Sequence, residues 1–265
     1  MDALEVSGAR GWVQRARFAF QFAKPRRTLF VLSHMRSYSS LLCHILHSNA
    51  DITGYIEQHA SYRSSIDLLD LRIRLAHEAE DGLSGRYVLD KILHNKAKLD
   101  PAILRRDDVF CVFMVREPEM TIKSTLAMVN RKSRWEGTDW KSDPAGYYVR
   151  RLDRLVELAE LRPRHSLFFE ADSLIDSTDA VLAGLSSFLE LKHPLAPTYE
   201  TFELTGKPRF GDPGKFIGAG EIVKERNEYA DVTIPEEDLL RAKEAFERTR
   251  DVLTRRCTTT VTSGV

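Results

Sequence analysis

The stretch TLFVLSHMRSYSSLLCHILH, residues 28–47, decides the fold. Its first five residues are apolar or β-branched, and they predict a buried strand. From Ser39 to His47 the spacing of Leu42, Ile45 and Leu46 is that of an amphipathic helix. The polar residues between the two form a connecting loop. A strand that leads directly into a helix is the unit from which parallel sheets with crossover helices are built.

The same alternation continues along the chain. The most hydrophobic run, VFCVFMV at 109–115, predicts a central strand that is buried on both faces. Further strands are predicted near 55–56, at 87–89 and at 166–169. Helices are predicted at 64–80, 117–130 and 144–161, after the strand at 166–169 to about Leu191, and from Pro235. We therefore expect a three-layer α/β/α fold with a central, mostly parallel sheet.

The length of 265 residues predicts a single domain that spans 1–265. Residues 1–26 mix Arg and Lys with Trp and Phe, which predicts an N-terminal helix that either packs on the domain or contacts a membrane surface. Glycine and proline crowd the segment between Pro194 and Pro235, so it is expected to be mostly loop. The polar residues 258–265 are expected to form a disordered tail.

The charges exclude some partners. The 39 Lys and Arg residues balance 39 Asp and Glu residues, which argues against nucleic-acid binding by bulk charge, so any anion site must be local. The three cysteines lie far apart, without the spacing of a disulfide scaffold or a zinc cluster. No transmembrane segment or secretory signal is predicted, so we expect a cytoplasmic protein, and a homodimer is left open.

The first candidate site is the sequence RSYSSLL, residues 36–42, at the start of the predicted helix. Helix N-terminal amides, serine hydroxyls and the Arg36 cation suit a phosphate-sized anion, although serines also cap helices without any ligand. The segment is not a Walker A loop, because it lacks the paired glycine and the Lys followed by Ser or Thr. This makes a kinase less favoured.

The second candidate site follows the central strand, where Arg116 precedes Glu117 and Pro118 and Ser124 follows eight residues later. Ligands of open α/β sheets bind at the carboxyl ends of the strands, so Arg116 and Ser124 are placed to reach one phosphate. Taken alone, Arg116 is better explained by an ion pair with a neighbouring carboxylate.

Together the two sites resemble the nucleotide-binding pattern of the PAPS-dependent sulfotransferases, in the bacterial and carbohydrate-type branch with its P-loop NTPase-like fold. The resemblance covers about residues 27 to 220 and implies PAPS (3′-phosphoadenosine 5′-phosphosulfate) as sulfonate donor, with 3′-phosphoadenosine 5′-phosphate (PAP) as product. It implies that the first loop holds the 5′ side of the nucleotide, through Arg36, Ser37, Tyr38, Ser39, Ser40 and Leu41, and that Arg116 and Ser124 hold the 3′-phosphate. The family's loop usually has glycine where this chain has Tyr38.

Two weaker matches follow in the same order. The segment FFEAD at 168–172 is similar to a family segment whose aromatic residue lies near the adenine, a position that Phe169 would take. The segment GDPGK at 211–215 is similar to a late loop that closes over the nucleotide. The resemblance implies that its cations are supplied by Lys207, Arg209 and Lys215.

The resemblance also implies a general base and a charge-stabilising lysine. Glu57, after the second strand, resembles the glutamate base of bacterial sulfotransferases. Lys91 and His94 loosely resemble the Lys-Thr-His segment of cytosolic ones, in which lysine and histidine are catalytic. Since His94 is one residue further from the lysine than in that family, we prefer Glu57 as base and Lys91 and Arg36 as charge-stabilising residues. His94 is then a substrate contact or the alternative base, and no metal is expected.

The sequence therefore predicts an enzyme that moves a sulfonate group from PAPS to a hydroxyl of a small-molecule, lipid or carbohydrate acceptor. Two other hypotheses stay open. One is a phosphotransferase similar to nucleotide kinases. The other is a non-catalytic nucleotide-binding module that docks on a membrane or a partner.

Overall fold

The computed structural model describes residues 25–78, 83, 85–130, 139–207, 215–224 and 229–262. The predicted N-terminal helix therefore lies almost wholly outside the described residues. Six strands form a parallel sheet in the order β2-β3-β1-β4-β5-β6. Their bounds are β1 Arg27–Leu32, β2 Ile52–Thr53, β3 Tyr87–Ile92, β4 Val109–Val115, β5 His165–Glu170 and β6 Thr259–Thr260.

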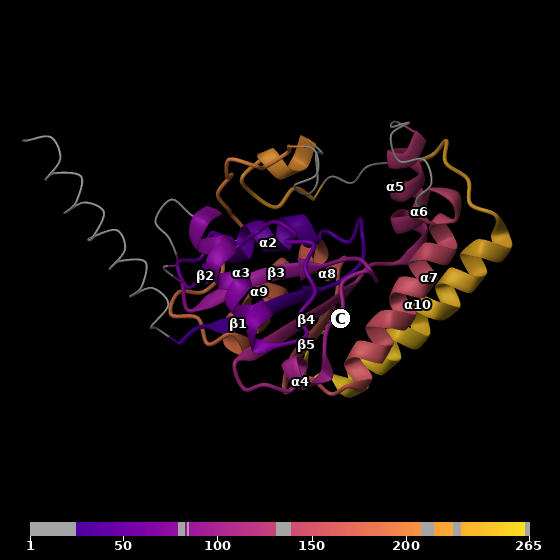
Figure 1. Ribbon diagram of the computed structural model, residues 1–265. Helices are drawn as coiled ribbons and strands as arrows, with labels where there is room; N and C mark the ends of the chain where they lie inside the picture. Colours follow the sequence, from indigo (N-terminus) through magenta and orange to yellow (C-terminus); the bar gives the residue numbers. More distant parts are fainter. Residues whose placement is uncertain are drawn as a thin grey trace, which may run out of the picture.

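Helices cover both faces of the sheet (Figure 1). They are α2 Ser39–His47, α3 Ser65–Glu78, α4 Pro101–Leu104, α5 Pro118–Asn130, α6 Asp139–Ser142, α7 Pro144–Glu160, α8 Ser173–Asp176, α9 Thr178–Phe188 and α10 Glu236–Arg256, with a short 3₁₀ helix, η2, at Lys215–Gly218. The predicted three-layer α/β fold is confirmed, and the sheet is wholly parallel rather than mostly parallel.

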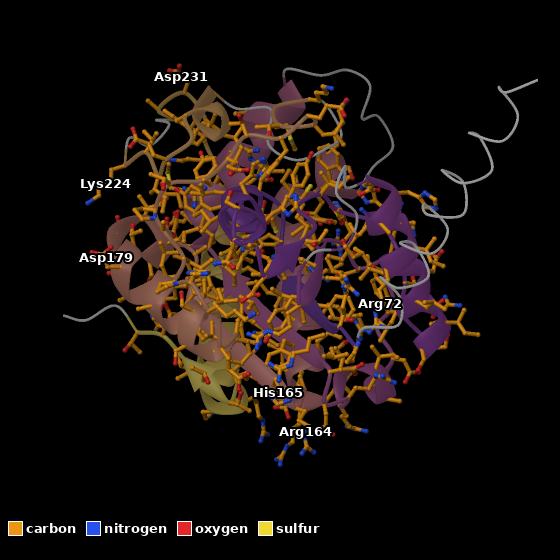
Figure 2. The ribbon with its side chains drawn as sticks, turned by 90° about the vertical axis from the view of Figure 1, so that its left-hand side faces the viewer. Arg72, Arg164, His165, Asp179, Lys224 and Asp231 are labelled. Atoms are coloured by element: carbon orange, nitrogen blue, oxygen red, sulfur yellow. The ribbon has the colours of Figure 1, made fainter. Side chains whose placement is uncertain are left out.

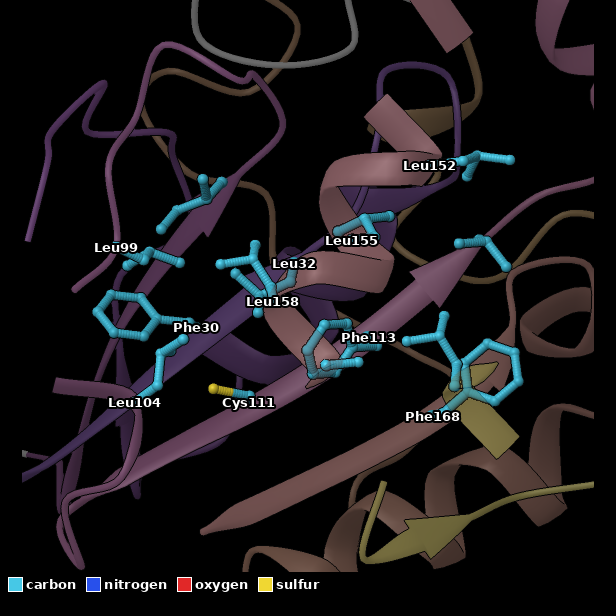
Figure 3. Packing of buried hydrophobic residues seen from close by; sticks show 14 of the residues in the cluster. Phe30, Leu32, Leu99, Leu104, Cys111, Phe113, Leu152, Leu155, Leu158 and Phe168 are labelled. Carbon is cyan, nitrogen blue, oxygen red and sulfur yellow. The ribbon is translucent and has the colours of Figure 1, made fainter. Parts of the chain in front are cut away.

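The alternation of side chains along β1 explains the two cores. Phe30 and Leu32 point to one face, where Leu152, Leu155 and Leu158 of α7 join the cluster (Figure 3). Helices α3 and α10 supply further apolar residues on this face. Leu29 and Val31 point to the other face and pack with α2 and α9. Because neighbouring side chains of a strand point to opposite faces, a strand that is apolar at every position is buried between two layers of helices. All seven residues of β4 are buried, as its run of apolar residues predicts.

Two details differ from the expectations. Residues 258–262 are not a disordered tail, because Thr259 and Thr260 pair with Leu167 and Phe168 as the edge strand β6. The second strand is β2 at Ile52–Thr53, so residues 55–56 already belong to the loop that follows it. Strands of only two residues carry little sequence signal, and their pairing is decided by the strand that they join.

The strand order reverses direction at β1. From β1 the chain first builds β2 and β3 on one side of that strand, and then β4 and β5 on the other. A reversal of this kind is the point at which open α/β sheets bind ligands. The loop after β1 and the exit of β4 therefore meet there.

Candidate functional site

The loop after β1 turns without glycine. Arg36 and Tyr38 have φ angles of 63° and 62°, in the left-handed region that glycine adopts most easily. The glycine of the family pattern is thus replaced by a tyrosine in the left-handed conformation. Left-handed backbone costs a non-glycine residue roughly 1–2 kcal/mol, so contacts elsewhere must hold this loop in place.

Buried hydroxyls supply some of those contacts. The Ser37 hydroxyl lies 2.7 Å from the His34 carbonyl oxygen and 2.7 Å from Ser33 Oγ, and Ser33 Oγ donates to the Met114 carbonyl at 2.6 Å. Ser33 and Ser37 are fully buried. The predicted ligand Ser37 is therefore used inside the loop, which it ties to the end of β4.

The Arg116 guanidinium packs on the same loop. It donates to the Tyr38 hydroxyl at 2.6 Å and to the Arg36 carbonyl oxygen at 3.1 Å, and its central carbon lies 4.1 Å from the centre of the Tyr38 ring. It also donates to Asp172 Oδ1 at 3.4 Å, so the ion pair considered from the sequence is present as well. Arg116 thus joins the carboxyl end of β4 to the loop after β1.

Ser124, in α5, contacts the same loop through Arg36. Its hydroxyl accepts a hydrogen bond from Arg36 Nε at 2.8 Å and another from the Tyr229 hydroxyl at 2.9 Å. Ser124 is buried, as is Arg116. The residues predicted to bind the two phosphate ends of one nucleotide therefore lie together, and we call Arg36, Arg116 and Ser124 the arginine cluster.

A further cation faces the start of α2. Lys91, in β3, is 2 % exposed, and its ammonium group donates to Ser40 Oγ at 3.1 Å. The first intrahelical hydrogen bond of α2 runs from the Leu42 amide to the Tyr38 carbonyl, so the Ser39, Ser40 and Leu41 amides precede it. No acidic residue stands in this first turn. Lys91 and the positive end of the α2 dipole thus create one region that favours an anion.

Glu57 lies beside His94, in the loop that follows β2 and begins at Gly54. Gly54 has φ 116°, and a Cβ there would come within 2.4 Å of the Leu89 carbonyl oxygen, so only glycine fits. Glu57 Oε2 lies 3.9 Å from His94 Nε2, and its Oε1 lies 3.6 Å from His59 Nδ1. Since β3 ends at Ile92, the extra residue before His94 does not turn its ring away from Glu57.

Asp90 anchors this loop from inside the fold. Its carboxylate accepts from the Gln58 amide at 2.9 Å and from the Tyr62 hydroxyl at 2.6 Å. Asp90 is fully buried in β3, next to Lys91. The position of Glu57 therefore depends on the strand that also carries Lys91.

Burial sets the protonation of the candidate bases. It raises the pKa of Glu57 to about 7, although the nearby Lys91 and Arg151 charges oppose that shift. Burial, together with the positive charge of Arg151, lowers the pKa of His94 to about 4. Near neutral pH His94 is thus uncharged, whereas Glu57 is poised to gain or lose a proton.

Some predicted residues do not join these groups. Phe169 is fully buried in the core beside α9, and its predicted place near the adenine stays a prediction. Lys207 is exposed and pairs with Glu203 at 3.3 Å. Arg209 lies outside the described residues, and of Lys215 only the backbone is described, as the first residue of η2.

Several residues near the site were not identified from the sequence. Arg151 in α7 is 1 % exposed and donates to the Ser33 carbonyl at 2.8 Å and to Asn95 Oδ1 at 3.1 Å. His34 Nε2 accepts from the Arg116 amide at 2.9 Å. A signal for Arg151 existed, because it is a charged residue at a position where α7 is otherwise apolar. The further residues are Tyr147, Asp172 and Tyr229.

Among the residues described, no group of His, Cys, Asp and Glu is arranged to hold a metal ion. In the same part of the chain, no helix is both long enough and apolar enough to cross a bilayer.

Comparison with known proteins agrees with the fold. No family model matches the chain, and no curated protein matches it in sequence. The structure is similar to a sulfotransferase domain from the curacin biosynthetic pathway, with a TM-score of 0.56 and 16 % identity over 84 % of this chain and 98 % of that one. It is also similar to a sulfotransferase domain from the olefin synthase of Synechococcus PCC 7002, with a TM-score of 0.54 and 16 % identity over 84 % and 96 %.

The chain thus has the α/β fold of bacterial sulfotransferase domains. At this level of identity the similarity concerns the fold, and an activity has to be argued from the residues of the site.

Proposed function

We propose that this chain is a sulfotransferase that transfers a sulfonate group from PAPS to a hydroxyl of a small-molecule, lipid or carbohydrate acceptor. The observation that carries the proposal is the hydrogen bond from Arg36 to Ser124, together with the packing of Arg116 on Tyr38. These contacts bring together two motifs, whose residues Arg36 and Ser124 are 88 positions apart in the sequence. Sulfotransferase domains share the fold that places them there.

The donors at this site suit a nucleotide with phosphate groups at both ends. Arg36, Lys91 and the first turn of α2 would hold the 5′ side, with Ser39 and Ser40 as hydroxyl donors. Arg116 and Ser124 would hold the 3′-phosphate. Guanidinium groups bind phosphate oxygens with paired hydrogen bonds, and helix N-termini favour anions. When bound, PAPS would supply the sulfonate group and a phosphate leaving group.

The reaction then needs a proton acceptor close to the lysine. Glu57 is our candidate, because burial raises the pKa of its carboxyl group to about 7 and so matches it to a proton transfer near neutral pH. Lys91, buried and bonded to Ser40, would stabilise negative charge that develops beside the α2 N-terminus. In this assignment Glu57 takes the proton of the acceptor hydroxyl, and Lys91 and Arg36 stabilise the charge on the leaving oxygen.

The proposal is tested by titrating PAP against the purified protein in a calorimeter without magnesium. We expect submillimolar binding by the wild type. ATP with magnesium is titrated in parallel, because a kinase-like protein would prefer it. No binding of PAP would overturn the proposal. Binding of PAP without turnover of any acceptor by protein supplied with PAPS would favour the non-catalytic module.

A further inference from the structure

Helix α7 contacts the two candidate general bases, Glu57 and His94, through a tyrosine to which the proposed function gives no role. The Tyr147 hydroxyl is hydrogen-bonded to His94 Nδ1. On its other side, His94 directs Nε2 at Glu57 Oε2, 3.9 Å away. The His94 ring therefore lies between a phenol and a carboxyl group, and each of its two nitrogens faces one of them.

The chemistry of these neighbours selects one form of the ring. Because His94 is uncharged near neutral pH, only one of its nitrogens carries a proton. An ionised carboxylate can only accept hydrogen bonds, whereas a tyrosine hydroxyl can donate or accept. A proton on Nε2 therefore places the positive end of an N–H dipole 3.9 Å from the Glu57 carboxylate, and the Tyr147 hydroxyl can then donate to the bare Nδ1. The opposite form would turn the Nε2 lone pair toward the negative charge of the carboxylate, which is electrostatically unfavourable.

We propose that Tyr147 is a positioning residue that holds His94 in the Nε2-protonated tautomer, with this N–H directed at the Glu57 carboxylate. The proposal deepens the proposed function, since it explains how Glu57 is kept oriented as a base. It also makes His94 a ring that turns its N–H dipole toward the base, 3.9 Å away, rather than the base itself. Tyr147 acts only through His94.

The other charged groups around Glu57 and His94 come from β3, from α7 and from the loops that follow β2 and β3. Lys91 and Asp90 lie on β3, Arg151 lies on α7 one turn after Tyr147, and His59 lies on the Glu57 loop; Lys96 follows His94. The positive charges of Lys91 and Arg151 favour ionised Glu57. Those of Arg151, His59 and Lys96 oppose a charge on His94. This arrangement favours a neutral ring beside a carboxylate.

The tautomer can be measured directly by nitrogen NMR on protein with ¹⁵N-labelled histidine at pH 8, where Glu57 is mostly ionised. A protonated ring nitrogen and a bare one differ widely in chemical shift, and His94→Gln assigns the signals among the eight histidines. We expect the wild type to show a bare Nδ1 and a protonated Nε2. In Tyr147→Phe we expect a mixture of the two tautomers. A protonated Nδ1 in the wild type, or an unchanged spectrum in Tyr147→Phe, would overturn the proposal.

Tyr87→Phe is the matched control, because it removes a buried hydroxyl at the opposite end of β3, where Tyr87 donates to the Leu189 carbonyl. It should leave the His94 signals unchanged. Thermal unfolding of the two variants shows whether either change disturbs the fold.

A kinetic measurement adds a second readout. In Tyr147→Phe we expect kcat to fall about tenfold and the pH at half-maximal kcat to rise, with little change in KM for PAPS. If the wild type binds no PAP, the proposed function fails while the NMR result still decides the role of Tyr147. The two failures are therefore distinguishable.

Discussion

Arg36 donates a hydrogen bond to Ser124 at 2.8 Å, and this contact joins a loop after the first strand to a helix after the fourth. Arg116 adds a second connection, through the Tyr38 ring and the Arg36 carbonyl. Both arginines are thus positioned by the protein itself. Charged groups that are held in place before a ligand arrives lose less entropy on binding it.

Replacing Arg116 by Gln should weaken PAP binding by on the order of 2 to 4 kcal/mol, or roughly 30- to 900-fold, because a buried charge-assisted contact is lost. Calorimetric titration measures the change. Arg164→Gln is the control, because Arg164 directly precedes β5 at the opposite end of the strands, where Figure 2 shows it beside His165. Equal affinities for wild type and Arg116→Gln would remove the assignment of the 3′-phosphate.

Replacing Glu57 by Gln should lower kcat by ~10²- to 10⁴-fold and leave PAP affinity nearly unchanged, because a proton acceptor is removed while the shape is kept. A pKa of about 7 means that the carboxylate form dominates only above that pH, so wild-type kcat should rise as pH increases through about 7. Initial rates of both proteins between pH 5.5 and 8.5, a range of about 1.5 units on each side of that pKa, measure the loss of kcat and its pH dependence. A Glu57→Gln variant with wild-type kcat would assign the base elsewhere.

The same raised pKa has a consequence for folding. The unfolded Glu57 carboxyl releases its proton near its ordinary pKa of 4.5, whereas the folded one keeps it until about 7. Between these values the native state binds more protons, so this group's contribution to stability falls as pH rises. We therefore expect Glu57→Gln to have a higher Tm than the wild type at pH 8, and a smaller difference at pH 5. Calorimetric scans at the two pH values test this.

Tyr38 offers a test of the left-handed turn. Tyr38→Ile and Tyr38→Asn both remove the ring and the hydroxyl that contact Arg116, but isoleucine tolerates a φ of 62° poorly, whereas asparagine tolerates it well. The Ile variant should be less stable than the Asn variant by ~1–2 kcal/mol. Urea unfolding of both proteins gives this difference. Equal free energies of unfolding would show that the turn relaxes.

His34 should make the protein sensitive to acid. Burial lowers the pKa of His34 to about 3, while the unfolded residue titrates near its ordinary 6.5. Between these values the unfolded state binds the additional proton, so stability decreases as pH falls from 6.5 towards 3. In this window His34→Gln should lose stability less steeply than the wild type, by at most ~1.4 kcal/mol per pH unit.

Denaturant unfolding at several pH values measures this slope. His193→Gln is the matched control, because His193 is exposed and should leave the slope as in the wild type. If His34→Gln and the wild type have the same slope, His34 does not remain neutral in the folded protein.

The main strands and helices were predictable because their signal is local. The apolar run at 109–115 became β4 with the same bounds, and helix α3 at Ser65–Glu78 lies within the predicted 64–80. β6 was missed because Thr259–Thr260 has no apolar pattern; the strand forms where the Val261 amide and its neighbours meet the edge of β5. Phe169 shows a different limit of the sequence, since an apolar strand residue also fits the core, and its predicted place near an adenine stays a prediction.

For the candidate site, too, the sequence predicted the residues but not their contacts. The residue types at 36–41, 57, 91, 94, 116 and 124 could be selected from the sequence, and their binding and catalytic roles stay predictions. The contacts among these residues could not be predicted from the sequence, because the contacts join residues that are far apart in the chain. Tyr147 and Arg151 belong to no motif, and their contacts with the site formed only when α7 packed across the ends of β1 and β3.

The order of apolar and polar residues by itself determined a parallel α/β sheet, because alternating strands and helices can bury their apolar faces only in layers. It also determined which cations, hydroxyls and carboxyl groups stand at the ends of strands. The tertiary structure alone decided which of them meet, how deeply they are buried and therefore which are charged. Distance and desolvation govern electrostatic energy, and neither is a property of a residue's position in the chain.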